Sequence, residues 1–414
     1  MTPGVQLYAH FDLPCGLTVS ALNTERLLRA RGAAVGRHSV ALREQWVDGA
    51  TDGDVNLLHI NPVDVVRFMM WPHADPRFED RLNLCAPFWE LGRLPDFWVP
   101  VLESMDAVLA PTSFVGDAVL AAVPDARVIR LPQAVTVPDN VQPDRARFGI
   151  PDDVFVFGTS FAAEAVLDRK NPEATIAAFL RAFPDERDVV LVVRASPTAA
   201  ADPVAVWEKL EAAAHGDPRV HVLRGRLDYA GILSLYATLD VYVSLHRAEG
   251  LGLGMMESMS LGTPVIATGW SGSMDFMTDD NSLPVSYAMT PVAVGPDSPY
   301  SVGSIGFVGE WAEPSIEDAA AKMQHLYADR ELTRRLSATA LEDMDSRRRE
   351  VERAAFVDEI TGLLTASPLP GKERRAAQLR SIESVQRRRG LYMRPYLKAR
   401  ATGGKLLRAT GLRP

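Results

Sequence analysis

Residues 244–277 read SLHRAEGLGLGMMESMSLGTPVIATGWSGSMDFM, and this stretch is the most informative in the chain. The apolar run Val241–Ser244 predicts a strand that leads into the glycine-rich turn 250–254, and a helix is expected to begin near Met255. Glycines let a backbone approach a ligand closely, and the free N–H groups of a helix start suit a phosphate. The order strand, glycine turn, helix therefore predicts an α/β domain with an anion-binding edge.

Two carboxylates flank this turn. Glu249 precedes it, and Glu257 is expected in the first turn of the helix. A phosphate would repel carboxylates, so these groups are better suited to sugar or ribose hydroxyls. The alternative for Glu257 is a structural role at a helix N-terminus, and for Glu249 a surface loop position.

Strands and helices alternate through most of the chain, a pattern typical of parallel sheets. In the first half we expect strands at Val5–His10, Val55–Ile60, Leu82–Phe88, Ala107–Ala110 and Val128–Leu131. The Pro- and Asp-rich stretch Thr136–Asp153 interrupts the pattern and is interpreted as a linker. In the second half we expect strands at Val154–Gly158, Val189–Arg194, Val220–Leu223, Val241–Ser244 and Val265–Thr268.

The chain is therefore predicted to be an α/β protein with two doubly wound, Rossmann-like domains that face a central cleft. We place the first domain at 1–140 and the second at 151–345, followed by a further helix at 346–366 and a basic amphipathic tail at 367–414. Residues Asn281–Gly309 are rich in Pro and Gly and are expected to form a long irregular loop.

The segment EGLGLGMMESMSLGTPVIAT resembles the E-x7-E motif of the family-4 retaining glycosyltransferases, with Glu249 and Glu257 at the two Glu positions. Enzymes of that family have the GT-B fold and bind a nucleotide sugar mainly with the second domain. The resemblance thus implies that 1–140 is the acceptor-binding domain, that 151–345 is the nucleotide-sugar-binding domain, and that 346–366 is the closing helix that crosses back to the first domain. The resemblance implies that Glu249 lies near the donor sugar and that Glu257 binds the ribose. It also implies that Gly252 and Gly254 lie against the donor. Leu251 and Gly254 depart from the usual motif, while both Glu residues are kept.

A second segment, DRKNPEATIAAF, places Arg169 and Lys170 beside a helix that is expected to open at Asn171–Pro172. Cations at such a position clamp a diphosphate, although alone a solvated pair would be the better interpretation. The string resembles the branch of the family active in surface-polysaccharide assembly, and Lys170 matches the phosphate-binding Lys. The Arg that usually follows the first strand of this domain is replaced by Thr159, so Arg169 or Arg194 is expected to substitute.

Further candidates follow other predicted strands. Ser271 and Gly272 form a turn near the donor in the surface-polysaccharide branch, and a plain turn is an equal alternative. Glu90 follows the strand at Leu82–Phe88, at the place where the family often has a His. Glu90 is a candidate to orient or deprotonate the acceptor hydroxyl. A structural role, in which Glu90 caps or pairs with a neighbouring group, is nearly as good an interpretation. Gly16, His59 and Asn61 are the remaining acceptor-side candidates.

No cofactor and no metal ion are expected. The pairs Asp52/Asp54 and Asp343/Asp345 have D-x-D spacing, but the first lies in a Gly-rich turn and the second in a charged helical stretch. GT-B enzymes neutralise the leaving diphosphate with Lys, Arg and helix N-termini instead. The two cysteines, Cys15 and Cys85, cannot by themselves form a disulfide framework or a Cys-based zinc site.

Charge is unevenly distributed along the chain. The net charge is −9, and residues 371–414 carry thirteen Lys or Arg and two Glu, which leaves −20 on the remainder. The acidic body repels nucleic acid, which is not expected as a partner. The basic, partly apolar tail fits contact with an anionic membrane, or a solvated segment that folds back on the body. The absence of a long apolar run and of a signal-peptide pattern favours a cytoplasmic location, with the inner face of the plasma membrane as one option.

The function that we expect is metal-independent transfer of a hexose-type sugar from a nucleoside-diphosphate sugar to a hydroxyl of a glycan or lipid-linked acceptor. The resemblance implies retention of configuration and a place in cell-surface polysaccharide or glycolipid assembly. Two alternatives stay open. One is another GT-B enzyme, such as a sugar-nucleotide epimerase or a glycoside phosphorylase. The other is a non-catalytic partner protein that binds a nucleotide or a glycan.

Overall fold

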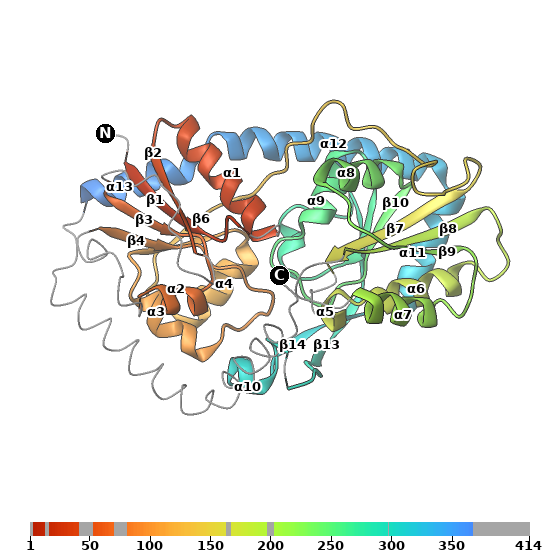
Figure 1. Ribbon diagram of the computed structural model, residues 1–414, viewed down its shortest axis with the longest axis horizontal. Helices are drawn as coiled ribbons and strands as arrows, with labels where there is room; N and C mark the ends of the chain where they lie inside the picture. Colours follow the sequence, from red (N-terminus) through yellow and green to blue (C-terminus); the bar gives the residue numbers. More distant parts are fainter. Residues whose placement is uncertain are drawn as a thin grey trace, which may run out of the picture.

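Two six-stranded parallel sheets, one in each half of the chain, form the framework of the protein in a computed structural model (Figure 1). The structure describes residues 3–12, 16–40, 53–69, 81–162, 167–196, 203–296 and 298–366. The basic segment 367–414, where membrane contact is expected, lies outside the described residues, as do Cys15 and Asp52.

The first sheet has the strand order β2-β1-β3-β4-β5-β6. Its strands are β1 (Gly4–Ala9), β2 (Ala34–Ser39), β3 (Val55–Leu58), β4 (Leu82–Cys85), β5 (Ala107–Ala110) and β6 (Val128–Arg130). Its helices are α1 (Gly16–Ala30), α2 (Pro62–Met69), the short η2 (Asp96–Trp98), α3 (Val99–Glu103) and α4 (Ser113–Ala122). Strand β2 was not expected, because its sequence AVGRHS contains few apolar residues and becomes a strand only by pairing along β1.

The second sheet has the order β12-β11-β10-β7-β8-β9. Its strands are β7 (Phe155–Ala162), β8 (Val189–Ser196), β9 (Val220–Leu223), β10 (Val241–Ser244), β11 (Val265–Thr268) and β12 (Leu283–Val285). Its helices are α5 (Leu167–Lys170), α6 (Pro172–Ala182), α7 (Pro203–Ala213), α8 (Tyr229–Thr238), α9 (Leu253–Ser260), η3 (Gly272–Asp275) and α11 (Ile316–Ala328).

Helices cover both faces of each sheet. In the second domain, α8 and α9 lie on one face, and α6, α7 and α11 lie on the other (Figure 1). Each face buries its own apolar cluster, as expected for strands that are buried on both sides. The prediction of two doubly wound α/β domains is confirmed.

The prediction of a long irregular loop over 281–309 is wrong. After β12, strand β13 (Tyr287–Pro291) pairs antiparallel with β14 (Glu310–Pro314), and the helix α10 (Val302–Ile305) lies between them. We call residues 287–296 and 298–314 the cap segment. The partner of β13 lies about twenty residues further along the chain and both strands are short, so local sequence pattern gives no indication of the pairing.

The prediction of one closing helix at 346–366 is also wrong. The crossing is made by two helices, α12 (Arg330–Glu352) and α13 (Ala355–Ala366), and α12 starts well before Asp345. Ala354, between them, has a φ of 48°, in the left-handed region that ends a helix. Helix α12 packs against α9 in the second domain, and α13 packs against the first sheet through Phe356 and Ile360.

Candidate active site

The glycine turn after β10 leads into α9 as predicted, with a small shift. Helix α9 begins at Leu253, so Glu257 lies in its second turn and not in the first. Gly252 precedes the helix with a φ of 95°, a conformation that an L side chain rarely adopts, and no side chain caps the first amides of α9. A Cβ on Gly254 would lie 2.9 Å from the Tyr242 hydroxyl. Gly252 is therefore required by its backbone conformation, whereas Gly254 leaves room for the Tyr242 hydroxyl.

Ser271 and Gly272 brace the backbone of Glu249. The Glu249 amide donates to Ser271 Oγ at 3.0 Å, and the Gly272 amide donates to the Glu249 carbonyl at 2.9 Å. Ser271 has φ 76° and ψ −156°, a strained conformation that the two hydrogen bonds hold in place. These two residues contact the peptide of Glu249, so the structure gives them a positioning role.

Replacing Gly272 with Ala should displace this turn. An added Cβ would lie 2.1 Å from the Gly250 carbonyl oxygen, a backbone atom that cannot move independently of Glu249. We expect a loss of about 1–3 kcal/mol in the free energy of unfolding, together with weaker binding at the site. Thermal unfolding checks this, with Gly362→Ala in α13 as the control, because no atom lies within 4 Å of a Cβ there. Equal stability of the two variants would contradict the expectation.

Four of the predicted residues meet in one charge cluster. Lys170 Nζ donates to the Glu249 carboxylate, and Arg169 Nη1 lies 3.4 Å from the same carboxylate. Arg169 also donates to the Ala248 carbonyl at 2.8 Å, and its Nη2 lies 4.0 Å from Glu90 Oε1. Glu90 comes from the loop after β4, so the cluster joins the two domains. Two cations and two carboxylates make it neutral overall.

The electrostatics of the cluster keep Glu249 ionised. Burial alone would raise the pKa of its carboxyl, but the cations of Lys170 and Arg169 outweigh that cost and lower the pKa to about 2. Glu249 is thus a carboxylate at every working pH. Its charge is positioned between a cation pair and the glycine turn.

A cavity of about 80 Å³ opens beside this pair, lined in part by Lys170, Glu249, Gly252 and Gly254. Its remaining lining includes the Tyr236 and Tyr242 rings and the end of β7 from Thr159 to Phe161. The volume is far below the roughly 300–1,000 Å³ of sites that hold an organic ligand. It fits a phosphate group and is too small for a whole nucleotide.

The two domains touch at the glycine turn that follows Glu249. Thr112 Oγ1 donates to the Gly250 carbonyl at 3.0 Å, and a Cβ on Gly250 would lie 2.9 Å from the Trp89 carbonyl oxygen. Asp275 of η3 accepts from the Ser113 amide at 2.9 Å and from Arg130 Nη2 at 2.8 Å. The turn that carries Glu249 is therefore held between the two domains.

Glu257 lies apart from the charge cluster. It is 6% exposed, and burial raises the pKa of its carboxyl to about 7, with a hydrogen bond from Tyr229 as the opposing effect. It therefore exchanges its proton near neutral pH. Nothing in the sequence indicated this raised pKa, because Glu257 is buried by the packing of α8 on α9.

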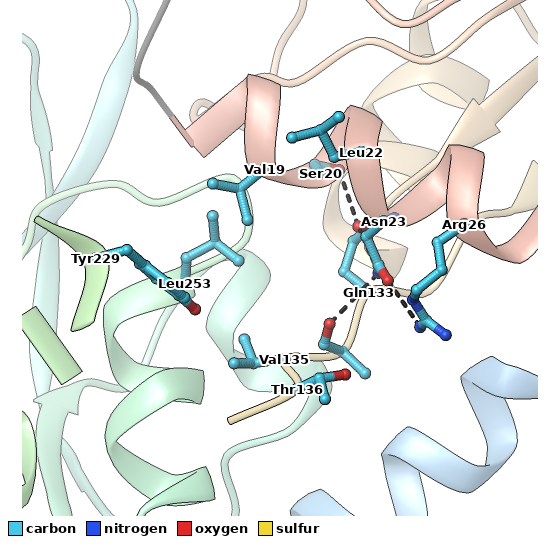
Figure 2. Close-up of a pocket in the computed structure, with 11 residues that line it drawn as sticks. Val19, Ser20, Leu22, Asn23, Arg26, Gln133, Val135, Thr136, Tyr229 and Leu253 are labelled. Atoms are coloured by element: carbon cyan, nitrogen blue, oxygen red, sulfur yellow. Dashed lines mark hydrogen bonds between the residues drawn. The ribbon is translucent and has the colours of Figure 1, made fainter. Parts of the chain in front are cut away.

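Tyr229 and Leu253 form one wall of a second, larger pocket of about 350 Å³ between the domains. Figure 2 shows that wall facing Val19 and Leu22 of α1, with Gln133, Val135 and Thr136 of the segment that follows β6 nearby. Leu253 lines both pockets, so they are neighbours. Two of the polar side chains here pair with each other, because Ser20 Oγ donates to Gln133 Oε1 at 2.9 Å. The wall is thus mainly apolar and adjoins Glu257 through Tyr229.

Arg194 lies on β8, behind the first cavity. Its guanidinium donates to Ser160 Oγ at 3.0 Å and to Ser196 Oγ at 3.1 Å, and its Nε has no partner among the described residues. It is 3% exposed, and burial lowers its pKa. Because Ser160 lines the cavity and Arg194 faces it only through Ser160, Arg194 contributes charge rather than direct contact.

The three acceptor-side candidates, Gly16, His59 and Asn61, do not meet in one site. Gly16 begins α1, and a Cβ there would lie 3.2 Å from Leu253 of the second domain. His59 is fully buried, its Nε2 lies 3.2 Å from Ser20 Oγ, and burial lowers its pKa to about 4. The Asn61 carboxamide oxygen accepts from the Phe88 amide at 2.8 Å. His59 and Asn61 support the loops of the first domain and have no contact with the charge cluster.

Within the described ranges, no three His, Cys, Asp or Glu side chains converge as a metal site would require. Asp343 accepts from the Asn281 side chain, and Asp345 is paired with Arg348 and Arg349 on α12. None of the helices in those ranges combines the length and the apolar character needed to cross a membrane.

The fold and one segment match known proteins. Residues 160–291, which include Arg169, Lys170, Glu249 and Glu257, match the family model of glycosyl transferases group 1. No curated protein sequence matches the chain. The match covers the segment in which the E-x7-E resemblance was found.

Solved structures share the fold over most of the chain. A sucrose-phosphate synthase from Thermosynechococcus elongatus is 15% identical with a TM-score of 0.65, covering 88% of this chain and 100% of its own. A glycosyltransferase from Rickettsia africae is 13% identical with a TM-score of 0.65, covering 88% and 99%. Anabaena Alr3699/HepE, in complex with UDP and glucose, is 14% identical with a TM-score of 0.61, covering 88% and 100%. At such identities the likeness is one of fold, and the fold is GT-B. The family match over residues 160–291 adds support for glycosyl transfer.

Proposed function

We propose that the protein transfers a hexose-type sugar, with retention of configuration, from a nucleoside-diphosphate sugar to a hydroxyl of a glycan or lipid-linked acceptor. The observation that carries the proposal is the pairing of Lys170 with Glu249 at the glycine turn before α9, beside a cavity of phosphate size. A role in cell-surface polysaccharide or glycolipid assembly, with peripheral membrane contact through 371–414, belongs to the same proposal and comes from the sequence resemblance.

The donor diphosphate would take the place that Glu249 now holds on Lys170. The uncapped N-terminus of α9 adds a favourable partial charge, and Arg194 adds a buried cation behind Ser160. Arg169 is held by Ala248, Glu249 and Glu90, so its role is to fix the two carboxylates. The leaving diphosphate is thus stabilised by groups that are already oriented, without a metal ion.

The nucleoside would extend from the diphosphate toward Glu257. Since Leu253 separates the two pockets, a ribose at Glu257 places the base near Tyr229, at the larger pocket between the domains. Separation at the Thr112–Gly250 contact would admit the donor, and closure would then exclude water from the reacting sugar.

Acceptor activation falls to Glu90, the carboxylate that the first domain brings to the cluster. Its side chain is 23% exposed, so it remains accessible from the cleft. A carboxylate here can accept a hydrogen bond from the attacking hydroxyl, as general base catalysis requires.

The test is thermal unfolding with UDP, GDP, ADP, dTDP and CMP, with and without magnesium. A ligand at 100 times its Kd stabilises by about 2.7 kcal/mol, which is visible as a shift in midpoint. We expect one diphosphate to act without magnesium and Lys170→Met to remove the shift. Lys209→Met, which breaks an exposed pair with Glu173, is the matched control. If no nucleotide shifts the midpoint, or Lys170→Met responds like the wild type, the donor site is placed wrongly.

A nucleotide shift alone would also be given by a protein that only binds. Transfer is therefore measured with the sugar nucleotide of the base that binds, following release of the nucleoside diphosphate with and without candidate glycan acceptors. Release that depends on an acceptor supports the transferase. Binding without any release favours a non-catalytic role.

A further inference from the structure

The start of α4 in the first domain is hydrogen-bonded to the second domain at two points. Thr112 Oγ1 donates to the Gly250 carbonyl at 3.0 Å. The Ser113 amide donates to the Asp275 carboxylate at 2.9 Å, and the Ser113 hydroxyl donates to the same carboxylate. The Asp275 side chain is 6% exposed, so this contact is largely shielded from water. Neighbouring residues of α4 thus hold the glycine turn and η3 together.

The segment of the second domain that contacts α4 also holds the backbone of Glu249. The Trp270 ring packs edge-on against Phe114 of α4, with ring centroids 5.1 Å apart. Residues 271–272 lie between this ring and Asp275, and their two hydrogen bonds fix the Glu249 peptide. A shift of η3 away from α4 would therefore displace the residues that hold Glu249 in place.

Helix α4 already has a cap of its own within the first domain. Thr112 Oγ1 accepts from the Val115 amide at 3.3 Å, as an N-cap residue does. The Asp275 carboxylate instead accepts from the amide of the first helical residue, Ser113, where the helix dipole favours a negative charge. Arg130, the other partner of Asp275, is half-exposed, and such a pair contributes little. The main effect of the contact between Asp275 and Ser113 is thus to join the two domains.

We propose that Asp275 is a positioning residue of the transfer reaction. By binding the start of α4 across the domain boundary, it holds η3, and with η3 the turn that carries Glu249, in the arrangement that transfer requires. Asp275 lines neither of the two pockets, so it acts through Ser271 and Gly272 and not by touching the substrate. Loss of the contact with Ser113 would free the turn, so Glu249 is fully positioned only while the domains are joined there. The inference rests on the proposed function.

Two variants, one on each side of the boundary, test the proposal. Asp275→Ala removes the acceptor, and Ser113→Pro removes both donors. Proline is tolerated at the first position of a helix, and Thr112, with φ −138° and ψ 160°, already has the extended conformation that precedes a proline. We expect transfer kcat to fall about 10- to 100-fold in each, as for loss of a hydrogen bond to a charged group. The Kd for the nucleoside diphosphate should stay near the wild-type value, because neither residue lines a pocket.

Asp318→Ala is the matched control. Asp318 also accepts from a backbone amide, that of Ser286 at 2.7 Å, but both residues belong to the second domain. Its free energy of unfolding should fall about as much as that of Asp275→Ala, while transfer kcat stays at the wild-type value. If Asp318→Ala loses as much kcat as Asp275→Ala, or if folded Ser113→Pro transfers sugar like the wild type, the contact serves stability alone and the proposal is overturned.

A double-mutant cycle tests whether Asp275 acts through Glu249. In a Glu249→Gln background, Asp275→Ala should lower kcat little further, because the charge that it positions is already gone. Losses that multiply in the double variant would place the effect of Asp275 elsewhere and overturn the proposal. If the wild type binds a nucleoside diphosphate but transfers no sugar, the proposed function fails, and this inference with it. Transfer by the wild type, together with unchanged transfer by Asp275→Ala and Ser113→Pro, overturns the inference alone.

Discussion

Replacing Glu249 with Gln should have two opposite effects on the site. Sugar transfer should fall by at least about 100-fold, since a charge preorganised beside the reacting sugar is lost. Binding of the nucleoside diphosphate should tighten by about tenfold, because Lys170 and Arg169 lose the carboxylate that now neutralises them. If Glu249 served only to stabilise the fold, its replacement would weaken both sugar transfer and nucleotide binding. Initial rates of transfer and calorimetric titration of the nucleotide measure the two effects separately.

Glu25→Gln is the matched control for this variant. Glu25 is a buried carboxylate of the first domain that pairs with Arg29 at 2.8 Å and with Arg37 at 2.6 Å. Its loss also leaves two cations uncompensated, so a comparable change in stability is expected, but nucleotide affinity and transfer should not change. Weaker nucleotide binding by Glu249→Gln would show that the carboxylate does not compete with the diphosphate for Lys170.

The competition explains why a carboxylate lies in a site for an anion. Without a ligand, two buried cations would be left unpaired, at a high desolvation cost. Glu249 removes that cost by pairing with the cations, and Ser271 and Gly272 hold its backbone in position through two hydrogen bonds. In the proposed function, a diphosphate bound to Lys170 would displace the carboxylate only within the same cleft, beside the donor sugar. The Glu249 carboxylate would thus neutralise the cations when the site is empty and lie beside the donor sugar when the site is occupied.

The fold was largely predictable from the sequence, because parallel strands buried on both faces read as short apolar runs. Runs such as Val189–Arg194 and Val265–Thr268 are found as β8 and β11. The strands that were not predicted are stabilised by pairing with strands that lie far away in the sequence. Strand β2 forms along β1, and β13 forms only against β14, so neither has a local pattern.

The candidate site was predictable where the glycine turn and its Glu residues are adjacent in sequence. The meeting of Glu90 with Arg169 was not, because those residues come from different domains. Tyr229 gave no signal, since a tyrosine is most often a core residue, and its importance comes from its place beside Glu257. His59 stood out in sequence as a titratable group at a strand end, yet it is bonded to Ser20 inside the first domain.

The stability of the free protein should fall as the pH rises through about 7, and Glu257 should be the cause. Its carboxyl has a pKa near 4.5 in the unfolded chain and about 7 when folded, because burial disfavours the charged form. A raised folded-state pKa contributes stability that is complete below pH 4.5 and lost as the pH rises through 7. The shift corresponds to about 3 kcal/mol at 1.36 kcal/mol per unit.

Glu257→Gln removes this ionisation, so its free energy of unfolding should lack that fall between pH 5 and 8.5. Urea unfolding of both proteins across this range measures the difference, and parallel curves would contradict the assignment. Tyr229→Phe provides an independent check, because the Tyr229 hydrogen bond lowers the Glu257 pKa and its loss should move the fall to higher pH. A ribose that donates its hydroxyls to the ionised carboxylate would favour the charged form, so nucleotide affinity should rise over the pH range in which the free protein loses stability.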